Sequence, residues 1–199
     1  MFDMSANEQF VYDLFKDEPH TWFDNNKNCF VISNDPKTGY IRFYGDDLME
    51  LEVYTDKSIP DFYLQFALVS RTSARGYFQT FFAYLLDDLK NEENKEVHYV
   101  HANKILFTCS CGASSRFFAN SLQEKVDPEK KDMVFDAISY EFLDDVHQDY
   151  DLIVLMPQIN YKKKEFKEKY GNDKVITVNT HDFATRNFDN VLNQILTAS

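Results

Sequence analysis

The stretch that decides the fold is Ile105–Arg116, which reads ILFTCSCGASSR. Ile105–Thr108 is a short apolar run that predicts a buried strand, and the small residues after it predict a loop that leads into a helix. In such a loop, small side chains let successive backbone N–H groups point inward, where they bind anions. The start of the helix adds unpaired N–H groups and a positive partial charge. The sequence therefore predicts an anion site around the thiol of Cys109.

Cys109 is the predicted nucleophile of this site. The donors that bind an anion also favour its thiolate, whose ordinary pKa is about 8.5. They would also hold the oxygens of a phosphoryl group attached to the sulfur. The predicted phosphate-binding residues follow it directly: Ser110, Cys111, Gly112, Ala113, Ser114, Ser115 and Arg116. The loop alone equally fits a buried cysteine that merely ends a strand before a small-residue helix start.

Two other chemistries fit the loop less well. Six residues separate Cys109 from Arg116 and four separate Cys111 from Arg116, and neither is the spacing of the low-molecular-weight protein tyrosine phosphatases. Cys109 and Cys111, with His98 and His101 upstream, match no zinc pattern, and the sequence has no second Cys-x-x-Cys pair. Neither a metal nor a cofactor is expected, and the histidines are interpreted as linker residues.

Downstream of the loop, strands and helices alternate. A helix with Phe117, Phe118 and Leu122 at packing spacing comes first, and the further elements expected are strands at Val134–Ser139, Leu152–Met156 and Val175–Val178 and helices at about Tyr161–Tyr170 and Phe188–Leu196. Strands that are apolar along their length and alternate with helices predict an α/β domain with a four-stranded parallel sheet and helices on both faces. Right-handed crossovers then bring Thr108, Met156 and Asn179 to one carboxyl edge, where such sheets bind ligands.

The first half predicts a smaller α+β module. Ser5–Glu8 has the spacing of a capping box, and apolar residues follow at helical spacing. Closely spaced strands with short turns predict an antiparallel meander, at Cys29–Ser33, Tyr40–Tyr44, Leu48–Tyr54 and Phe62–Val69, before a helix at about Ser73–Lys90. Alternation along Leu48–Tyr54 predicts a half-buried strand, with Glu50 and Glu52 on the face away from the core. The many aromatic residues are interpreted as core.

The polar run Asn91–Glu96 predicts a boundary between a module at residues 1–95 and a domain at residues 101–199. The role of the module stays open between docking, regulation and dimerisation. The net charge of -12 argues against nucleic acid and anionic lipid as partners. No apolar window reaches the roughly 18 residues of a membrane span, and the N-terminus lacks the features of a signal peptide. A cytoplasmic protein with no membrane insertion is expected, and three sparse cysteines fit a reducing compartment.

The second half resembles the enzyme IIB domains of the lactose/cellobiose class of the bacterial phosphoenolpyruvate-dependent sugar phosphotransferase system. Ile105–Ser115 is similar to the family's apolar strand followed by Cys-Ser-Ala-Gly-Met-Ser-Thr-Ser. Asp151–Tyr161 looks like the family's apolar strand that runs into Gly-Pro-Gln, with a tyrosine three residues after the glutamine. Val175–Val178 with Asn190–Leu192 is a weaker third match. Together these motifs stand in the family's order and spacing.

The resemblance implies a phosphotransferase component. Cys109 would accept a phosphoryl group from a histidine of a IIA protein and pass it to a sugar held by a IIC membrane permease. Pro157, Gln158 and Tyr161 would lie on the same edge and either wall the loop or contact a partner, although a turn proline and a packing tyrosine fit equally. The alternative function is a regulatory sensor of phosphorylation state that is built on the IIB fold and does not serve sugar uptake directly.

The sequence departs from the family's pattern at three loop positions. Ala113 replaces the family's methionine, Cys111 adds a second thiol, and Arg116 stands where a small residue is usual. Arg116 is expected either to strengthen phosphate holding or to change which partner docks.

Overall fold

The computed structural model describes residues 5–16, 21–24, 29–45, 47–88, 102–126 and 133–197. The chain divides into two compact units, Met1–Asn91 and Glu92–Ser199, and each is described by itself. The expected boundary run Asn91–Glu96 and the two histidines His98 and His101 lie outside the described residues. No helix in the described ranges is long and apolar enough to cross a membrane.

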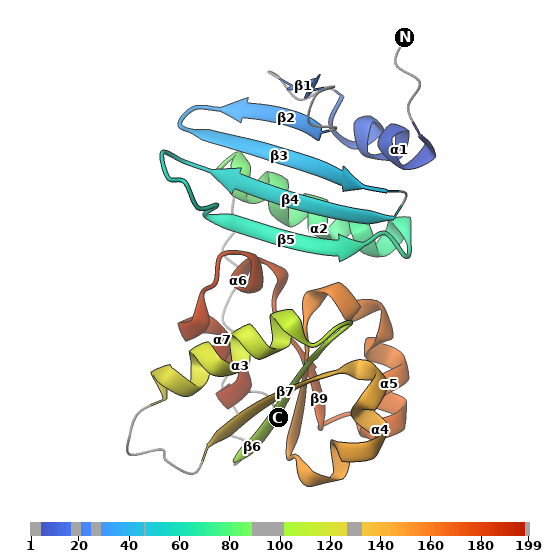
Figure 1. Ribbon diagram of the computed structural model, residues 1–199, viewed down its shortest axis with the longest axis vertical. Coiled ribbons are helices and arrows are strands. Elements are labelled where there is room, and N and C mark those ends of the chain that lie inside the picture. The colour runs from blue at the N-terminus through green and yellow to red at the C-terminus, as the bar shows by residue number, and fades with distance from the viewer. Residues whose placement is uncertain are drawn as a thin grey trace. The chain divides into compact units, whose positions relative to one another are not determined.

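The first unit is a five-stranded antiparallel meander with two helices (Figure 1). Its elements are α1 (Ala6–Phe15), β1 (Thr21–Asp24), β2 (Cys29–Asn34), β3 (Lys37–Tyr44), β4 (Leu48–Tyr54), β5 (Phe62–Ala67) and α2 (Arg71–Leu85). The strands pair in sequence order, which confirms the predicted meander. The sequence did not predict β1, since it is only four residues long and a strand of that length carries little periodicity.

The core of this unit is aromatic, as the sequence predicts. The Ser5 hydroxyl accepts from the Glu8 N–H and the Glu8 carboxylate accepts from the Ser5 N–H, so the predicted capping box begins α1. Phe15 and Phe30 pack edge to face with ring centres 4.9 Å apart. A Cβ at Gly39 would lie 2.8 Å from the Phe81 ring, so the side chain of Phe81 in α2 packs directly against the backbone of β3.

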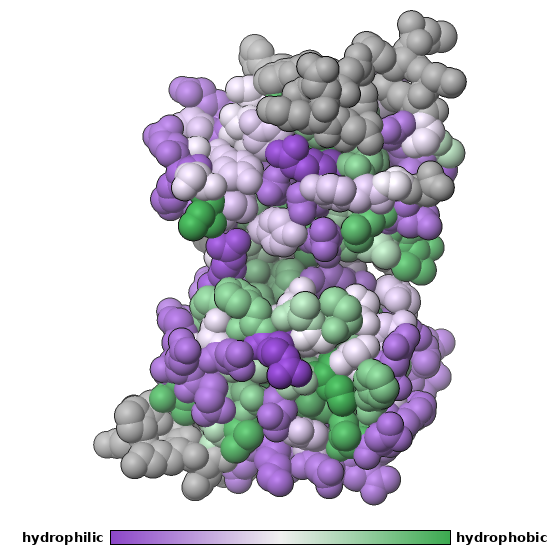
Figure 2. All heavy atoms as spheres, in the orientation of Figure 1, coloured by the Kyte–Doolittle hydropathy of each residue, from purple (hydrophilic) through white to green (hydrophobic). Residues whose placement is uncertain are grey.

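The opposite face of this sheet carries a polar network. In Figure 1, α2 lies behind the sheet, and Figure 2 shows hydrophilic and intermediate residues on the face in front. Glu50 and Glu52 point to this face from β4, away from the core, and they are nevertheless only 8% and 7% exposed. Neighbouring arginine, tyrosine and glutamine side chains enclose them, which a one-strand pattern does not reveal.

The second unit has the predicted four-stranded parallel sheet, in the order β7-β6-β8-β9. Its strands are β6 (Lys104–Cys109), β7 (Val134–Ser139), β8 (Leu152–Leu155) and β9 (Val175–Thr177). Its helices are α3 (Ala113–Lys125), α4 (Leu143–Val146), α5 (Lys163–Tyr170), α6 (Thr180–Ala184) and α7 (Phe188–Thr197). Figure 1 shows α3 and α7 on one side of the sheet and α4 and α5 on the other, which confirms the predicted fold class.

Some boundaries differ from those expected. Cys109 is the last residue of β6 rather than the first residue of the loop. The helix expected from Tyr161 begins at Lys163, because Pro157–Lys162 first forms a 3-10 segment. The short helices α4 and α6 were not predicted, since four or five residues are too few to show a helical period.

Candidate functional site

The loop between β6 and α3 closes around the sulfur of Cys109. This residue is only 2% exposed. The Gly112 N–H donates to Sγ at 3.1 Å, and the Ser115 Oγ lies 3.4 Å from the same sulfur. Ser115 Oγ also lies 3.0 Å from the Gly112 carbonyl, so its single proton can go either to that carbonyl or to the Cys109 thiolate. The thiol therefore sits inside the turn, against the first residues of α3.

Gly112 gives the loop this shape for two reasons. Its φ is +80°, in the left-handed region that favours glycine, and a Cβ on it would lie 3.3 Å from the backbone nitrogen of Ser139. Ser139, at the end of β7, donates its hydroxyl to the Ser110 carbonyl at 2.8 Å. The end of the neighbouring strand thus supports the loop from the side.

The electrostatics of the loop favour a thiolate. Burial by itself raises the pKa of Cys109, but hydrogen bonds from the Ser115 hydroxyl and from the N–H groups of Ser115, Cys111 and Gly112 lower it more. The pKa therefore lies below the ordinary value of the thiol. A donor that is fixed near the sulfur stabilises its charged form, and the same donors suit an anion bound to it.

Gln158, in the 3-10 segment that follows β8, contacts the loop. Its Nε2 donates to the Ser114 hydroxyl at 3.5 Å, the outer limit of a hydrogen bond. Its Oε1 is buried and forms no hydrogen bond to any described residue, and the same holds for the hydroxyl of Thr108 directly before Cys109. Two buried polar atoms without a described partner thus belong to residues at this carboxyl edge, where such atoms normally need one.

The two other residues expected at this edge lie differently. Pro157 is buried and begins the 3-10 segment after β8. Tyr161 is 40% exposed, and its pKa is raised by burial and then by the nearby Tyr140. The structure thus brings Gln158 to the loop and leaves Tyr161 partly exposed.

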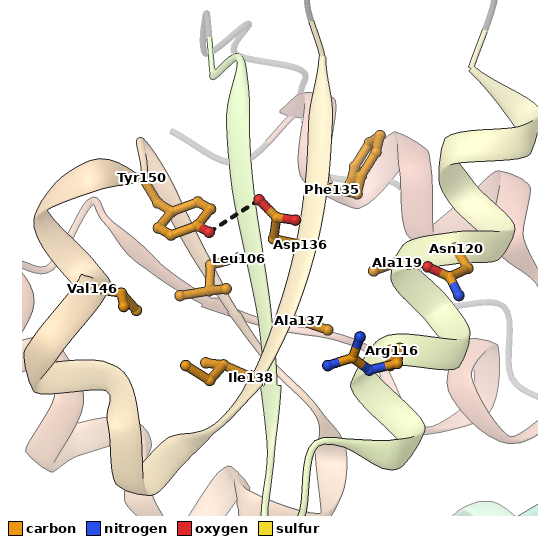
Figure 3. Close-up of a pocket in the computed structure, with 10 residues that line it drawn as sticks. All are labelled: Leu106, Arg116, Ala119, Asn120, Phe135, Asp136, Ala137, Ile138, Val146 and Tyr150. Carbon is orange, nitrogen blue, oxygen red and sulfur yellow. Dashed lines mark hydrogen bonds between the residues drawn. The ribbon is translucent and has the colours of Figure 1, made fainter.

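Arg116 lies one turn into α3. Its N–H donates to the Gly112 carbonyl at 3.0 Å, but its guanidinium extends toward β7, beside Ala137 (Figure 3). Cys111, on the loop, and Ala113, the first residue of α3, are exposed. No group of three or more histidine, cysteine, aspartate or glutamate side chains in the described ranges is arranged to hold a metal ion.

Ser139 is a site residue that the sequence reasoning missed. Its position at the end of the second predicted strand was a signal, because parallel strands end at one edge. β7 and β6 pair in parallel with Cys109 opposite Ser139. Knowing only the order of the strands would have placed this hydroxyl beside the loop.

The fold and the loop together define a parallel α/β domain with a thiolate-favouring cysteine at the turn between a strand and a helix. Residues 104–194, slightly less than half of the chain, match the model of the family described as PTS system, Lactose/Cellobiose specific IIB subunit. The resemblance seen in the sequence is thereby confirmed for this part of the chain.

One matching solved structure is the solution structure of the cellobiose-specific phosphotransferase IIB component protein from Borrelia burgdorferi. It is 22% identical, with a TM-score of 0.38, and the match covers 48% of this chain and 95% of that one. No curated protein matches the chain.

Proposed function

We propose that Cys109 carries a phosphoryl group in sugar phosphotransfer. The family match over residues 104–194 supports a role in a sugar phosphotransferase system. The observation that carries the assignment to Cys109 is its sulfur, held at the end of β6 by the Gly112 N–H and Ser115 Oγ. A thiolate is the nucleophilic form of cysteine, and fixed donors around it stabilise the charge of a transferring group.

In the first step, the Cys109 thiolate attacks the phosphorus of a phosphohistidine on a IIA protein. The S–P bond forms as the N–P bond breaks, and the histidine leaves. In the second step, a sugar hydroxyl bound by a IIC permease loses its proton and attacks the same phosphorus, and the thiolate leaves. The lowered pKa of Cys109 helps the second step, because a more stable thiolate leaves more readily. Such a carrier would work in the cytoplasm, with no metal in either step.

The experiment is phosphorylation with phosphoenolpyruvate, the general proteins of the system and a panel of IIA proteins, followed by intact mass. Wild type and Cys111→Ser should each gain one phosphoryl group, whereas Cys109→Ser should gain none. A label on Cys109→Ser that is equal to that of wild type would sink the assignment.

The alternative is a regulatory sensor of phosphorylation state. It is favoured by the compact unit Met1–Asn91, which lies outside the residues that the family model matches. A protein partner that binds only the phosphorylated or only the unphosphorylated form would support the sensor. Production of sugar phosphate with a matching IIC permease would support the carrier.

A further inference from the structure

The outer edge of β7 has a short open section between two covered ends. Among the described residues, β7 is an edge strand of its sheet and pairs with β6 alone. At its start, the Gln123 side chain accepts from the Phe135 N–H at 3.0 Å and donates to the Met133 carbonyl at 3.2 Å, as a neighbouring strand would. At its end, Ser139 is joined to the β6–α3 loop through Ser110. The described part of the chain thus leaves the middle of the strand open.

The open section centres on Ala137. The Val134 N–H donates to the carbonyl of Asn103, directly before β6. The backbone N–H and C=O groups of the even-numbered residues of β7 therefore point toward β6, and those of the odd-numbered residues point away from it. The outward N–H and C=O of Ala137 and the C=O of Phe135 form no hydrogen bond to any described residue. An edge of this kind is a template for an added extended chain.

A groove of about 250 Å³ straddles this section of the edge (Figure 3). On the α3 side it is lined by Arg116, Ala119 and Asn120. On the other side it is lined by the apolar side chains of Leu106, Ile138 and Val146, with Tyr150. The hydroxyl of Tyr150 donates to the Asp136 carboxylate at 3.0 Å. Both side chains lie on the side of β7 that is opposite to Arg116 (Figure 3).

Arg116 gives the groove its charge preference. It forms no ion pair and no side-chain hydrogen bond with the rest of the described chain, and its guanidinium extends toward Ala137 (Figure 3). The side chains of an extended segment alternate between the two faces of a sheet. A segment beside Ala137 would place one side chain near Arg116 and the next near Leu106, Ile138 and Val146.

We propose that the open edge of β7 binds an extended segment of a partner protein, with an acidic side chain that pairs with Arg116 and an apolar neighbour in the groove. Main-chain bonds to Ala137 supply affinity, and the two sides of the groove supply specificity. A second copy of this chain fits poorly. If two β7 edges paired, the Gln123 side chain and α3 of each copy would lie against the other copy, and the open section is only a few residues long.

The opposite edge of the sheet provides a matched control. β9 is also an edge strand, and a groove beside it contains Lys163 and Lys167. β9 is the shorter of the two edge strands, with three residues, Val175–Thr177, against six in β7. An acidic peptide attracted by charge alone would prefer the two lysines beside β9, whereas one that adds a strand would prefer β7.

The test is titration of the full isotope-labelled chain with two synthetic peptides, followed by amide resonances in NMR. Both alternate valine and threonine and differ only in a central glutamate or lysine. The glutamate peptide should shift the Ala137 amide and slow its hydrogen exchange, and it should bind at least about tenfold more tightly than the lysine peptide. Arg116→Glu should reverse this preference, Ala137→Pro should abolish binding, and Lys167→Glu should change nothing.

Binding by Ala137→Pro at the wild-type affinity would overturn the proposal, as would shifts centred on β9 or no shift at millimolar peptide. Self-association of the peptide-free chain that is lost in Ala137→Pro would also overturn it, in favour of a second copy. Arg116→Glu keeps the proposal testable if the proline variant does not fold, because Arg116 lies on the exposed side of α3. The experiment needs no phosphorylation of Cys109, so its outcome is independent of the proposed carrier function.

Discussion

Glu50 and Glu52 in the first unit and Cys109 in the second are each less than a tenth exposed, but their polar surroundings differ. Glu50 accepts from the hydroxyls of Tyr44 at 3.0 Å and Tyr63 at 2.9 Å, one on each oxygen. Glu52 accepts from Arg42 Nε and from the Tyr54 hydroxyl, both at 2.9 Å. Every carboxylate oxygen of the pair therefore has a partner within the sheet.

The tyrosines of this network are tuned to stay protonated. Burial, followed by the hydrogen bond to Glu52, raises the pKa of Tyr54 to about 12, and burial and Glu50 likewise raise the pKa of Tyr63. They remain donors at any ordinary pH. Around Cys109, by contrast, the donors are directed at a charge on the sulfur. A satisfied network of carboxylates and hydroxyls stabilises a sheet, whereas donors fixed around a sulfur stabilise its thiolate and an anion bound to it.

The largest effect is expected from Gly112→Ala. A side chain at φ +80° and 3.3 Å from the Ser139 nitrogen should lower the free energy of unfolding of the second unit by about 3 kcal/mol. It should also slow phosphoryl transfer by displacing the Gly112 N–H from Cys109. Gly76→Ala is the control, because Gly76 lies in α2 with open space around it. Alanine there should stabilise the first unit by about 0.5–1 kcal/mol. Urea unfolding measures the stability change of each variant. Equal changes for Gly112→Ala and Gly76→Ala would show that the backbone conformation of Gly112 does not require glycine.

Glu52→Ala should come next, and its effect should stay within the first unit. The variant leaves Arg42 and the Tyr54 hydroxyl without their acceptor, which should cost about 2 kcal/mol of stability. Glu165→Ala, which removes an exposed pair with Lys162, should change stability by less than about 0.5 kcal/mol. Thermal unfolding measures the loss of stability, and the phosphorylation assay shows whether labelling changes. Unchanged stability with slower labelling would show that the network serves the site instead.

Ser115→Ala should raise the pKa of Cys109, because it removes a hydroxyl that stabilises the thiolate. In a Cys111→Ser background, the pH profile of alkylation by iodoacetamide should move upward. Ser114→Ala should leave the profile in place, since the Ser114 hydroxyl bonds to Gln158. A profile unchanged by Ser115→Ala would exclude the hydroxyl as the cause.

The same pKa shift links stability to pH. Because the pKa of Cys109 is lower in the folded chain, its stabilising contribution is complete above the ordinary thiol pKa and is lost as the pH falls through the folded value. Ser115→Ala should reduce this contribution. The measurement compares the free energies of unfolding of wild type and Ser115→Ala from about pH 6 to about pH 9. The stability of wild type should fall more than that of the variant as the pH is lowered.

Gln158→Leu should have the smallest effect on stability. Leucine removes a weak 3.5 Å bond and a buried oxygen without a described partner, so stability should stay the same or rise by up to about 1 kcal/mol. Phosphorylation should nevertheless slow several-fold if the amide contacts the transferring group. Chemical denaturation and single-turnover labelling separate the two effects, and a marked loss of stability would assign Gln158 to the fold alone.

Periodicity predicted much of the fold. The apolar strands and their alternation with helices gave the parallel sheet, and the capping box at Ser5 marked the start of α1. The short elements β1, α4 and α6 were missed because they span too few residues for a period to appear. The burial of Glu50 and Glu52 could not be predicted either, since it depends on side chains from three strands that become neighbours only in the sheet.

Local sequence predicts some contacts of the loop residues but not those that depend on other strands. The nearness of Gly112 and Ser115 to Cys109 follows from a tight turn into a helix, which is a local property. The direction of the Arg116 side chain depends on β7, which comes later in the chain. The support of the loop by Ser139 likewise depends on the order of the strands, which the sequence did not specify.

Locating the phosphoryl group on the labelled chain tests the role of Cys109 directly. The labelled wild-type chain would be cleaved under mildly alkaline conditions and its peptides sequenced by mass spectrometry. We expect the phosphoryl group on the sulfur of Cys109, and on no other residue. A phosphoryl group on Cys111 or on a histidine, with Cys109 unmodified, would show that Cys109 is not the carrier.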